Sequence, residues 1–145
     1  MRVLVQRVIS SSVEVEGKVV GSIDKGLNIL VGFTDTDTSK EIDYMVDKVI
    51  NLRIFDDENG VMNKSLLDVG GSILSISQFT LYADASKGRR PSYIKALSGD
   101  KATILYDEFN NKLRENNIKV ETGIFGADMK VNILNDGPVT IFIEK

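Results

Sequence analysis

The chain has 145 residues, enough for one domain with a substantial core, and its 42% hydrophobic and 27% charged residues are typical of a globular protein. It contains no cysteine and no histidine, which excludes disulfides, thiolate chemistry, imidazole bases and the commonest metal ligands. Its net charge of −3 argues against broad coating of a nucleic acid, although a local basic contact with one RNA end stays open.

The hydrophobic pattern predicts many short strands and two amphipathic helices. The predicted strands cover residues 1–9, 12–16, 19–23, 27–33, 53–55, 72–82, 118–122, 127–134 and 139–144. The predicted helices cover residues 39–52, begun by a capping box of Thr38 and Glu41, and residues 99–115, capped by Ser98. Residues 65–69 are ambiguous. Because the strands mostly follow one another without regular βαβ alternation, we predict an α+β fold, an antiparallel barrel-like sheet with two outer helices.

The whole chain, residues 1–145, is predicted to form a single domain, because no linker, repeat or low-complexity segment interrupts it. No apolar run approaches the about 20 residues of a membrane-spanning helix. The first eight residues have the pattern of a strand and lack the features of a signal peptide. We therefore expect a cytoplasmic protein with no membrane partner.

Charged side chains lie in or beside predicted strands at two places, at Arg7 and at residues 56–60. Arg7 is either buried with a partner for its charge, or packed along its stem with its head in water. The acidic residues at 56–60 are interpreted as a solvated turn and not as metal ligands. We expect no metal and no cofactor, so catalysis would have to use carboxylates, lysine, hydroxyls, backbone N–H groups or groups of the substrate.

The stretch Ser77-Gln78-Phe79-Thr80-Leu81 closes the longest predicted strand. On an ideal strand Gln78 and Thr80 share one face, and Phe79 and Leu81 share the other. Unpaired backbone N–H groups at a strand end can stabilise an oxyanion in a pocket that excludes water. The alternative is that Gln78 and Thr80 simply begin the solvent-exposed part of the strand.

Two further stretches each have two interpretations. The loop of residues 84–92 carries Lys87, Arg89 and Arg90, which either hold phosphates or form a solvated basic loop. Phe125, between two glycines, either stacks on a nucleic-acid base or fills a strand junction.

The stretch Asn135-Asp136-Gly137-Pro138-Val139-Thr140 separates two alternating runs near the C-terminus. Asp-Gly between such runs predicts a β-turn that joins two hairpin strands. Pro138 fits this prediction poorly, because proline lacks the N–H that a paired strand needs.

Together, these stretches resemble the motifs of the D-aminoacyl-tRNA deacylases. The resemblance rests on residues 77–81, 88–92 and 135–140, and on Phe125-Gly126-Ala127 with Met129. It spans essentially the whole chain, with the same length and motif order, and residues 1–8 are similar to the family's first strand. It implies hydrolysis of the ester that joins a D-amino acid to the terminal ribose of tRNA, and removal of glycine from mischarged tRNA. It also implies a homodimer with a barrel-like α+β fold.

The resemblance also implies roles for particular residues. The catalytic set is Gln78, Phe79 and Thr80, and the substrate-binding set is Ser77, Phe125, Met129, Arg7, Gly137 and Pro138. A Gly137-Pro138 peptide held cis in one subunit would reach into the pocket of the other and exclude L-amino acids sterically. Phe125 and Met129 would line an adenine pocket, and Arg7 would brace the Gly-Pro loop.

Because a threonine hydroxyl without a neighbouring base is a poor nucleophile, we favour a different route for the hydrolysis. Water attacks with help from the vicinal 2′-hydroxyl, and N–H groups around Phe79 and Thr80 bind the oxyanion. Two alternatives compete with this hypothesis. A non-catalytic tRNA- or DNA-binding barrel would use the Lys87–Arg90 loop, but the acidic composition counts against it, and we expect no DNA partner. A general small-ester hydrolase is disfavoured because no activated nucleophile pair is present.

Overall fold

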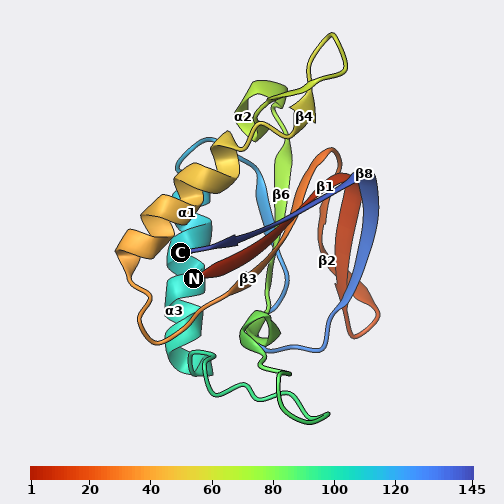
Figure 1. The fold of residues 1–145 in the computed structure, drawn as a ribbon. Helices are drawn as coiled ribbons and strands as arrows, with labels where there is room; N and C mark the ends of the chain where they lie inside the picture. The colour runs from red at the N-terminus through yellow and green to blue at the C-terminus, as the bar shows by residue number, and fades with distance from the viewer.

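One long strand organises the fold, which a computed structural model describes for all residues 1–145. β1 (Arg2–Val15) pairs antiparallel with β2 (Lys18–Ile23), β3 (Gly26–Gly32) and β8 (Lys130–Glu144). Its first half lies between β3 and β8, and its second half lies between β2 and β8. The sheet curls around this strand into a nearly closed barrel (Figure 1).

The far side of the sheet is parallel. β6 (Ser72–Ser77) runs parallel to β3, and β7 (Val120–Thr122) runs parallel to β6. The prediction of an α+β barrel-like sheet is therefore confirmed, although the sheet is mixed and not antiparallel throughout. The difference arises because parallel neighbours need a crossover connection, usually a helix. In chain order, α1 (Ser39–Asn51) comes between β3 and β6, and α3 (Gly99–Arg114) comes between β6 and β7.

Helices α1 and α3 pack side by side on one side of the sheet, as the two predicted outer helices (Figure 1). The capping box of α1 is confirmed, since the Thr38 N–H donates to Glu41 Oε2 at 2.8 Å. Ser98 precedes α3 but makes no side-chain capping bond. The main core fills the space between these helices and the inner face of the sheet. None of the helices is both long and apolar enough to cross a membrane.

The remaining elements are short. β4 (Phe55–Asp56) and β5 (Met62–Lys64) form a separate two-stranded hairpin. The ambiguous residues 65–69 form the one-turn helix α2 (Leu66–Val69), and a 3₁₀ turn, η1 (Phe79–Tyr82), follows β6. The predicted strand over residues 72–82 is thus too long. β6 ends because its partner β3 ends at Gly32, which leaves the next residues without a ladder to join.

The predicted hairpin at residues 135–140 is wrong, because β8 continues through it. Val8 of β1 pairs with Asn135, and Gln6 pairs with Thr140, so only Arg7 stands opposite four residues of β8. The stretch is a wide bulge in one strand, and bulged residues need no ladder bond. This explains why proline is tolerated at position 138. The Gly137-Pro138 peptide is cis, and Gly137 has φ +117°, a conformation that L side chains rarely adopt.

Candidate active site

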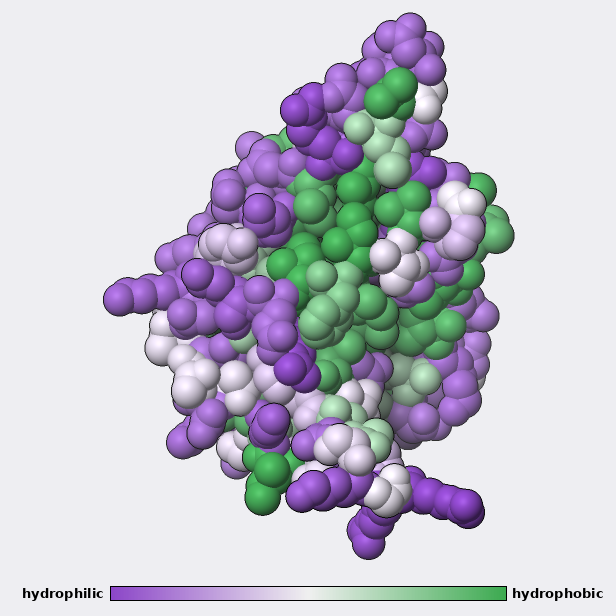
Figure 2. All heavy atoms as spheres, in the orientation of Figure 1, coloured by the Kyte–Doolittle hydropathy of each residue, from purple (hydrophilic) through white to green (hydrophobic).

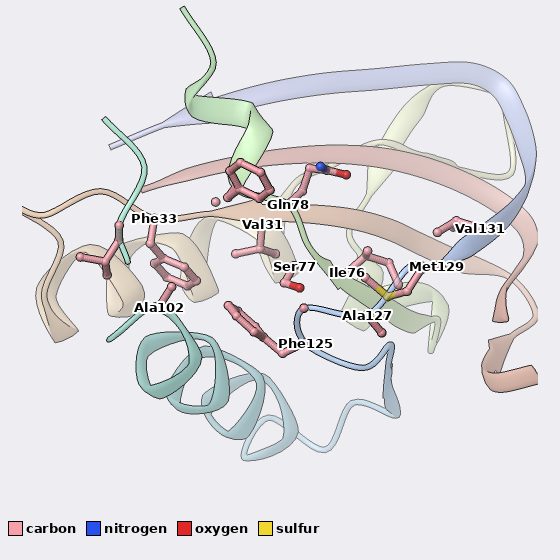
Figure 3. Close-up of a pocket in the computed structure, with 14 residues that line it drawn as sticks. Val31, Phe33, Ile76, Ser77, Gln78, Ala102, Phe125, Ala127, Met129 and Val131 are labelled. Atoms are coloured by element: carbon pink, nitrogen blue, oxygen red, sulfur yellow. The ribbon is translucent and has the colours of Figure 1, made fainter. Parts of the chain in front are cut away.

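A cavity of about 310 Å³ lies where β3 and β6 end, beside η1, the start of α3 and the segment between β7 and β8. Ten of its 14 lining residues are hydrophobic, two are glycines, and the only polar side chains belong to Ser77 and Gln78. Figure 3 shows Phe125 and Met129 on the wall that leads into β8, facing Ile76 and Ser77 of β6. No lining side chain is ionisable, so the cavity offers shape and backbone groups and no acid or base.

The start of η1 presents two free backbone donors. The Gln78 N–H makes the last bond to β3, donating to Val31 O at 2.7 Å. The N–H groups of Phe79 and Thr80 have no acceptor in the protein. They are the first N–H groups of a helical turn, and no earlier turn supplies carbonyl groups to accept from them. Phe79 lines the cavity and Thr80 is the next residue, so these donors lie close to it. They are the kind of group that stabilises a developing oxyanion.

The Thr80 hydroxyl is held by its neighbour. Gln78 Nε2 donates to Thr80 Oγ1 at 2.5 Å. An amide is not a base, so this contact orients the hydroxyl and cannot remove its proton. The bond forms because η1 folds back on itself after β6, which brings the side chains of residues 78 and 80 together.

The apolar wall of the cavity rests on a buried tyrosine. The Phe125 ring packs against the Tyr106 ring of α3 with their centroids 5.8 Å apart. The Tyr106 hydroxyl donates to the backbone oxygen of Ser75 in β6 at 2.7 Å. Burial raises the pKa of Tyr106, so it stays neutral and keeps this hydrogen bond at ordinary pH. The contact ties α3 to β6 directly beneath the cavity.

Arg7 is buried with partners, which confirms the first of its two interpretations. Only 6% exposed, it donates through Nη1 to Ile54 O at 2.7 Å, and its Nε lies 3.1 Å from the Asp136 carboxylate. Nη1 also lies 3.3 Å from the Asp56 carboxylate. The Asp56 side chain is therefore partly exposed to solvent and also forms an ion pair with Arg7, which corrects the view of residues 56–60 as a solvated turn. Arg7 is the one residue of β1 opposite the bulge, and its Nε donates to the backbone oxygen of Asp136 at 3.3 Å, which holds the bulge against β1.

The structure brings together some of the predicted site residues and separates others. The members that line the cavity are Ser77, Gln78, Phe79, Phe125 and Met129. Thr80 is attached through its bond with Gln78. The members that do not line the cavity of their own chain are Arg7, Gly137 and Pro138, and the last two are exposed.

Sequence reasoning missed the apolar lining that other elements supply. Phe33, Leu97 and Ala102 reach the cavity from the end of β3, the loop before α3 and α3 itself. Their local pattern is that of ordinary core residues, so nothing in it distinguishes a cavity wall from a core contact.

Fold and cavity together define a small α+β protein with an uncharged, mostly apolar cavity at the end of a curled mixed sheet. The family described as D-Tyr-tRNA(Tyr) deacylase matches residues 4–144. The chain is also 60% identical over 144 residues to a D-aminoacyl-tRNA deacylase of Clostridium botulinum (strain 657 / Type Ba4), which covers 99% of this chain and 97% of that protein. The chain belongs to the D-Tyr-tRNA(Tyr) deacylase family, a family of enzymes.

Two solved structures are similar along their whole length. One is titled c-Myc DNA Unwinding Element Binding Protein; it is 41% identical with a TM-score of 0.94 and covers 100% of this chain and 99% of its own. The other is titled as a probable eukaryotic D-amino acid tRNA deacylase; it is 21% identical with a TM-score of 0.84, covering 98% of this chain and 97% of its own. At that identity the second likeness supports the fold alone.

Proposed function

We propose that the protein hydrolyses the ester between a D-amino acid and the terminal ribose of tRNA, releasing the free D-amino acid and tRNA. The observation that carries this proposal is an uncharged cavity lined by Phe79, where the N–H groups of Phe79 and the next residue, Thr80, are free. The family membership and the 60% identity to proteins named D-aminoacyl-tRNA deacylase supply the substrate class.

The chemistry must work without an acid or base from the cavity wall. An aminoacyl ester is already activated, because the neighbouring 2′-hydroxyl of the ribose can assist attack by water. The tetrahedral intermediate then carries its negative charge on the former carbonyl oxygen, which the N–H groups of Phe79 and Thr80 bind. Gln78 and Thr80 orient the ester through their mutual bond, and Ser77 adds a polar group to the wall.

Phe125 and Met129 form the apolar wall that takes the adenine of the terminal nucleotide. A base needs a flat, apolar neighbour, and Phe125 is held in place by the Tyr106 ring. Met129 packs against Gly123, two residues before Phe125, because Gly123 has no side chain; a Cβ there would lie 2.4 Å from the Met129 sulfur. An adenine on this wall leaves its ribose ester directed toward η1.

Chiral selection belongs to the bulge at Gly137-Pro138, acting in a second copy of the chain. In its own chain the bulge is exposed and does not line the cavity, so it can close only a partner's cavity. Arg7 makes it a firm wall, against which an L side chain clashes while a D side chain points away. Glycine has no side chain to clash, so glycyl-tRNA is a substrate as well.

A homodimer agrees with the apolar surface around β8. Phe142 is 50% exposed and Leu134 is 56% exposed, although both lie on a paired strand. Figure 2 shows an apolar strip through the middle of the molecule, in the region that β8 crosses in Figure 1. Contiguous apolar surface of this kind is typical of an interface.

One experiment tests the reaction and its selectivity together. The protein is incubated separately with D-Tyr-tRNA, L-Tyr-tRNA, Gly-tRNA and D-tyrosine methyl ester, and its mass in solution is measured by light scattering. We expect loss of the D-tyrosyl and glycyl esters of tRNA, an intact L-tyrosyl ester and methyl ester, and a dimer. Loss of the L ester, or no loss of any substrate, contradicts the proposal.

The second candidate is a nucleic-acid-binding protein without activity. It is favoured by one observation, the 41% identity to a structure titled c-Myc DNA Unwinding Element Binding Protein. This candidate predicts salt-sensitive DNA binding and no release of any amino acid from tRNA.

A further inference from the structure

The loop between Asp84 and Ser92 follows η1, the turn whose Phe79 lines the cavity, and its own hydrogen bonds close it. Its ends are joined by two backbone bonds, Asp84 N to Ser92 O at 2.8 Å and Ser92 N to Asp84 O at 2.9 Å. The Asp84 carboxylate accepts from the Ser86 N–H at 2.9 Å, and hydrogen bonding by the Ser86 side chain and N–H lowers the pKa of Asp84. Gly88 turns the tip with φ +71°. The loop therefore projects as a closed finger.

The finger is positive on a negative protein. Residues 84–92 contain three lysine or arginine residues and one carboxylate, whereas the whole chain has a net charge of −3. Lys87, Arg89 and Arg90 are exposed, and none of them takes part in an ion pair. The charges of the finger are thus available to a ligand, while the rest of the surface repels polyanions.

Both ends of the finger are attached to the site. It begins two residues after η1, whose Phe79 lines the cavity, and Tyr93 follows its last residue. The Tyr93 ring meets the Phe79 ring edge-on, with the centroids 5.1 Å apart. In Figure 1 the finger extends beyond η1 at the end of the molecule away from the β4–β5 hairpin, and Figure 2 shows long hydrophilic side chains projecting there. A ligand with its end in the cavity would pass this finger as it leaves.

We propose that Lys87, Arg89 and Arg90 bind the phosphodiester backbone of the RNA whose 3′ end occupies the cavity. This inference rests on the proposed function and deepens it, since it makes the phosphates the feature by which a tRNA ester is preferred to a free ester. Guanidinium groups suit the task because they bind phosphate oxygens through two parallel bonds. The finger contributes to substrate affinity and takes no part in the reaction.

The test compares R89A/R90A with K18A/K40A, which removes the same charge from exposed positions outside the finger. Binding of uncharged tRNA is measured as a function of salt, and hydrolysis is measured with D-Tyr-tRNA and with the D-tyrosyl ester of adenosine, which has no phosphate. For R89A/R90A we expect about a tenfold higher Kd and KM for tRNA, and a salt slope smaller by about 1.5 to 2. Its kcat, and its rate on the adenosine ester, stay at the wild-type value.

The control K18A/K40A separates a local effect of the finger from a general effect of charge, and the variant R89K/R90K tests whether charge alone is sufficient. K18A/K40A should behave like wild type, and R89K/R90K should recover most of the salt slope, because a slope counts charges. Wild-type affinity and slope in R89A/R90A overturn the inference, as does an equal loss in K18A/K40A, which would indicate a general charge effect. Binding of duplex DNA as tightly as tRNA, lost in R89A/R90A, also overturns it and assigns the finger to DNA. If wild type releases no amino acid but tRNA binding still depends on the finger, the proposed function fails and the phosphate contact stands.

Discussion

Replacing Arg7 with alanine is expected to lower the free energy of unfolding by about 3 kcal/mol. The largest share comes from the bond of Nη1 to the Ile54 oxygen at 2.7 Å, because a bond from a charged donor contributes about 1.5–3 kcal/mol. The carboxylates of Asp56 and Asp136 are 51% and 42% exposed, so water screens them and each adds only about 0.5 kcal/mol. For a chain of this size the loss corresponds to a Tm lower by about 6 to 12 °C.

Replacing Arg7 with alanine should also change the activity and selectivity of the protein, because Arg7 holds the bulge at Gly137-Pro138 in place. The Arg7 guanidinium donates to the Asp136 backbone oxygen, and its Nη2 lies close to Gly137. Without it, the residues around Gly137 lose these contacts. A looser wall admits side chains that a fixed wall excludes. We therefore expect a lower rate on D-Tyr-tRNA and measurable hydrolysis of L-Tyr-tRNA.

The assay is urea unfolding followed by circular dichroism, at several protein concentrations because a dimer couples unfolding to dissociation. Arg7→Lys keeps the charge but loses the planar fork, and it should fall between wild type and Arg7→Ala. Arg53→Ala is the matched control, because Arg53 is exposed and bonds only to exposed Asn63. A free energy of unfolding for Arg7→Ala within about 1 kcal/mol of wild type would refute the reasoning, because a bond from a charged donor alone is worth more than that.

Three further predictions concern the site and its support. Thr80→Ala should keep most of the single-turnover rate on D-Tyr-tRNA, and a loss of a thousandfold or more would instead identify the hydroxyl as nucleophile. Tyr106→Phe should lower the free energy of unfolding by about 1–2 kcal/mol in urea titrations, because the Ser75 oxygen loses a buried donor at 2.7 Å; unchanged stability would show that the oxygen finds another partner. The hydroxyl and N–H of Thr38 lower the pKa of Glu41 below 4.5, so the stability from this cap is present above that pH and is lost as pH falls through the lowered value. Glu41→Gln should flatten acid unfolding there, and an unaltered profile would contradict this.

Much of the fold could be predicted from local pattern. The alternating runs predicted β1, although as two strands at residues 1–9 and 12–16, and its turn into β2, and the apolar stripe with Thr38 and Glu41 predicted α1 and its first residue. These predictions succeed because the burial of one face and the satisfaction of the first N–H groups are decided within a few residues. The cavity residues Gln78 and Phe125 were also found, through motif resemblance and not through their local pattern, which fits an exposed strand end or a core position equally well.

Two of the errors have a common cause. Residues 78–82 have the composition of a strand, but β3 ends beside them and they turn into η1. Asp136 and Gly137 have the composition of a hairpin turn, but β1 continues past them and keeps β8 in one direction. In both places the neighbouring strand decides the backbone, and a neighbour distant in sequence leaves no trace in local propensity.

The sequence by itself determined which chemistry is available: without histidine or cysteine, the protein must work with backbone groups, amides and shape. It also determined the local elements and, through its motifs, the family. Only the tertiary structure decided that β6 stops to free the Phe79 and Thr80 N–H groups, and that Arg7 stands alone opposite the Gly137-Pro138 bulge. Both features depend on where partner strands begin and end. That register is set by contacts between residues far apart in the chain, because buried faces and paired backbone groups must be satisfied across the whole sheet at once.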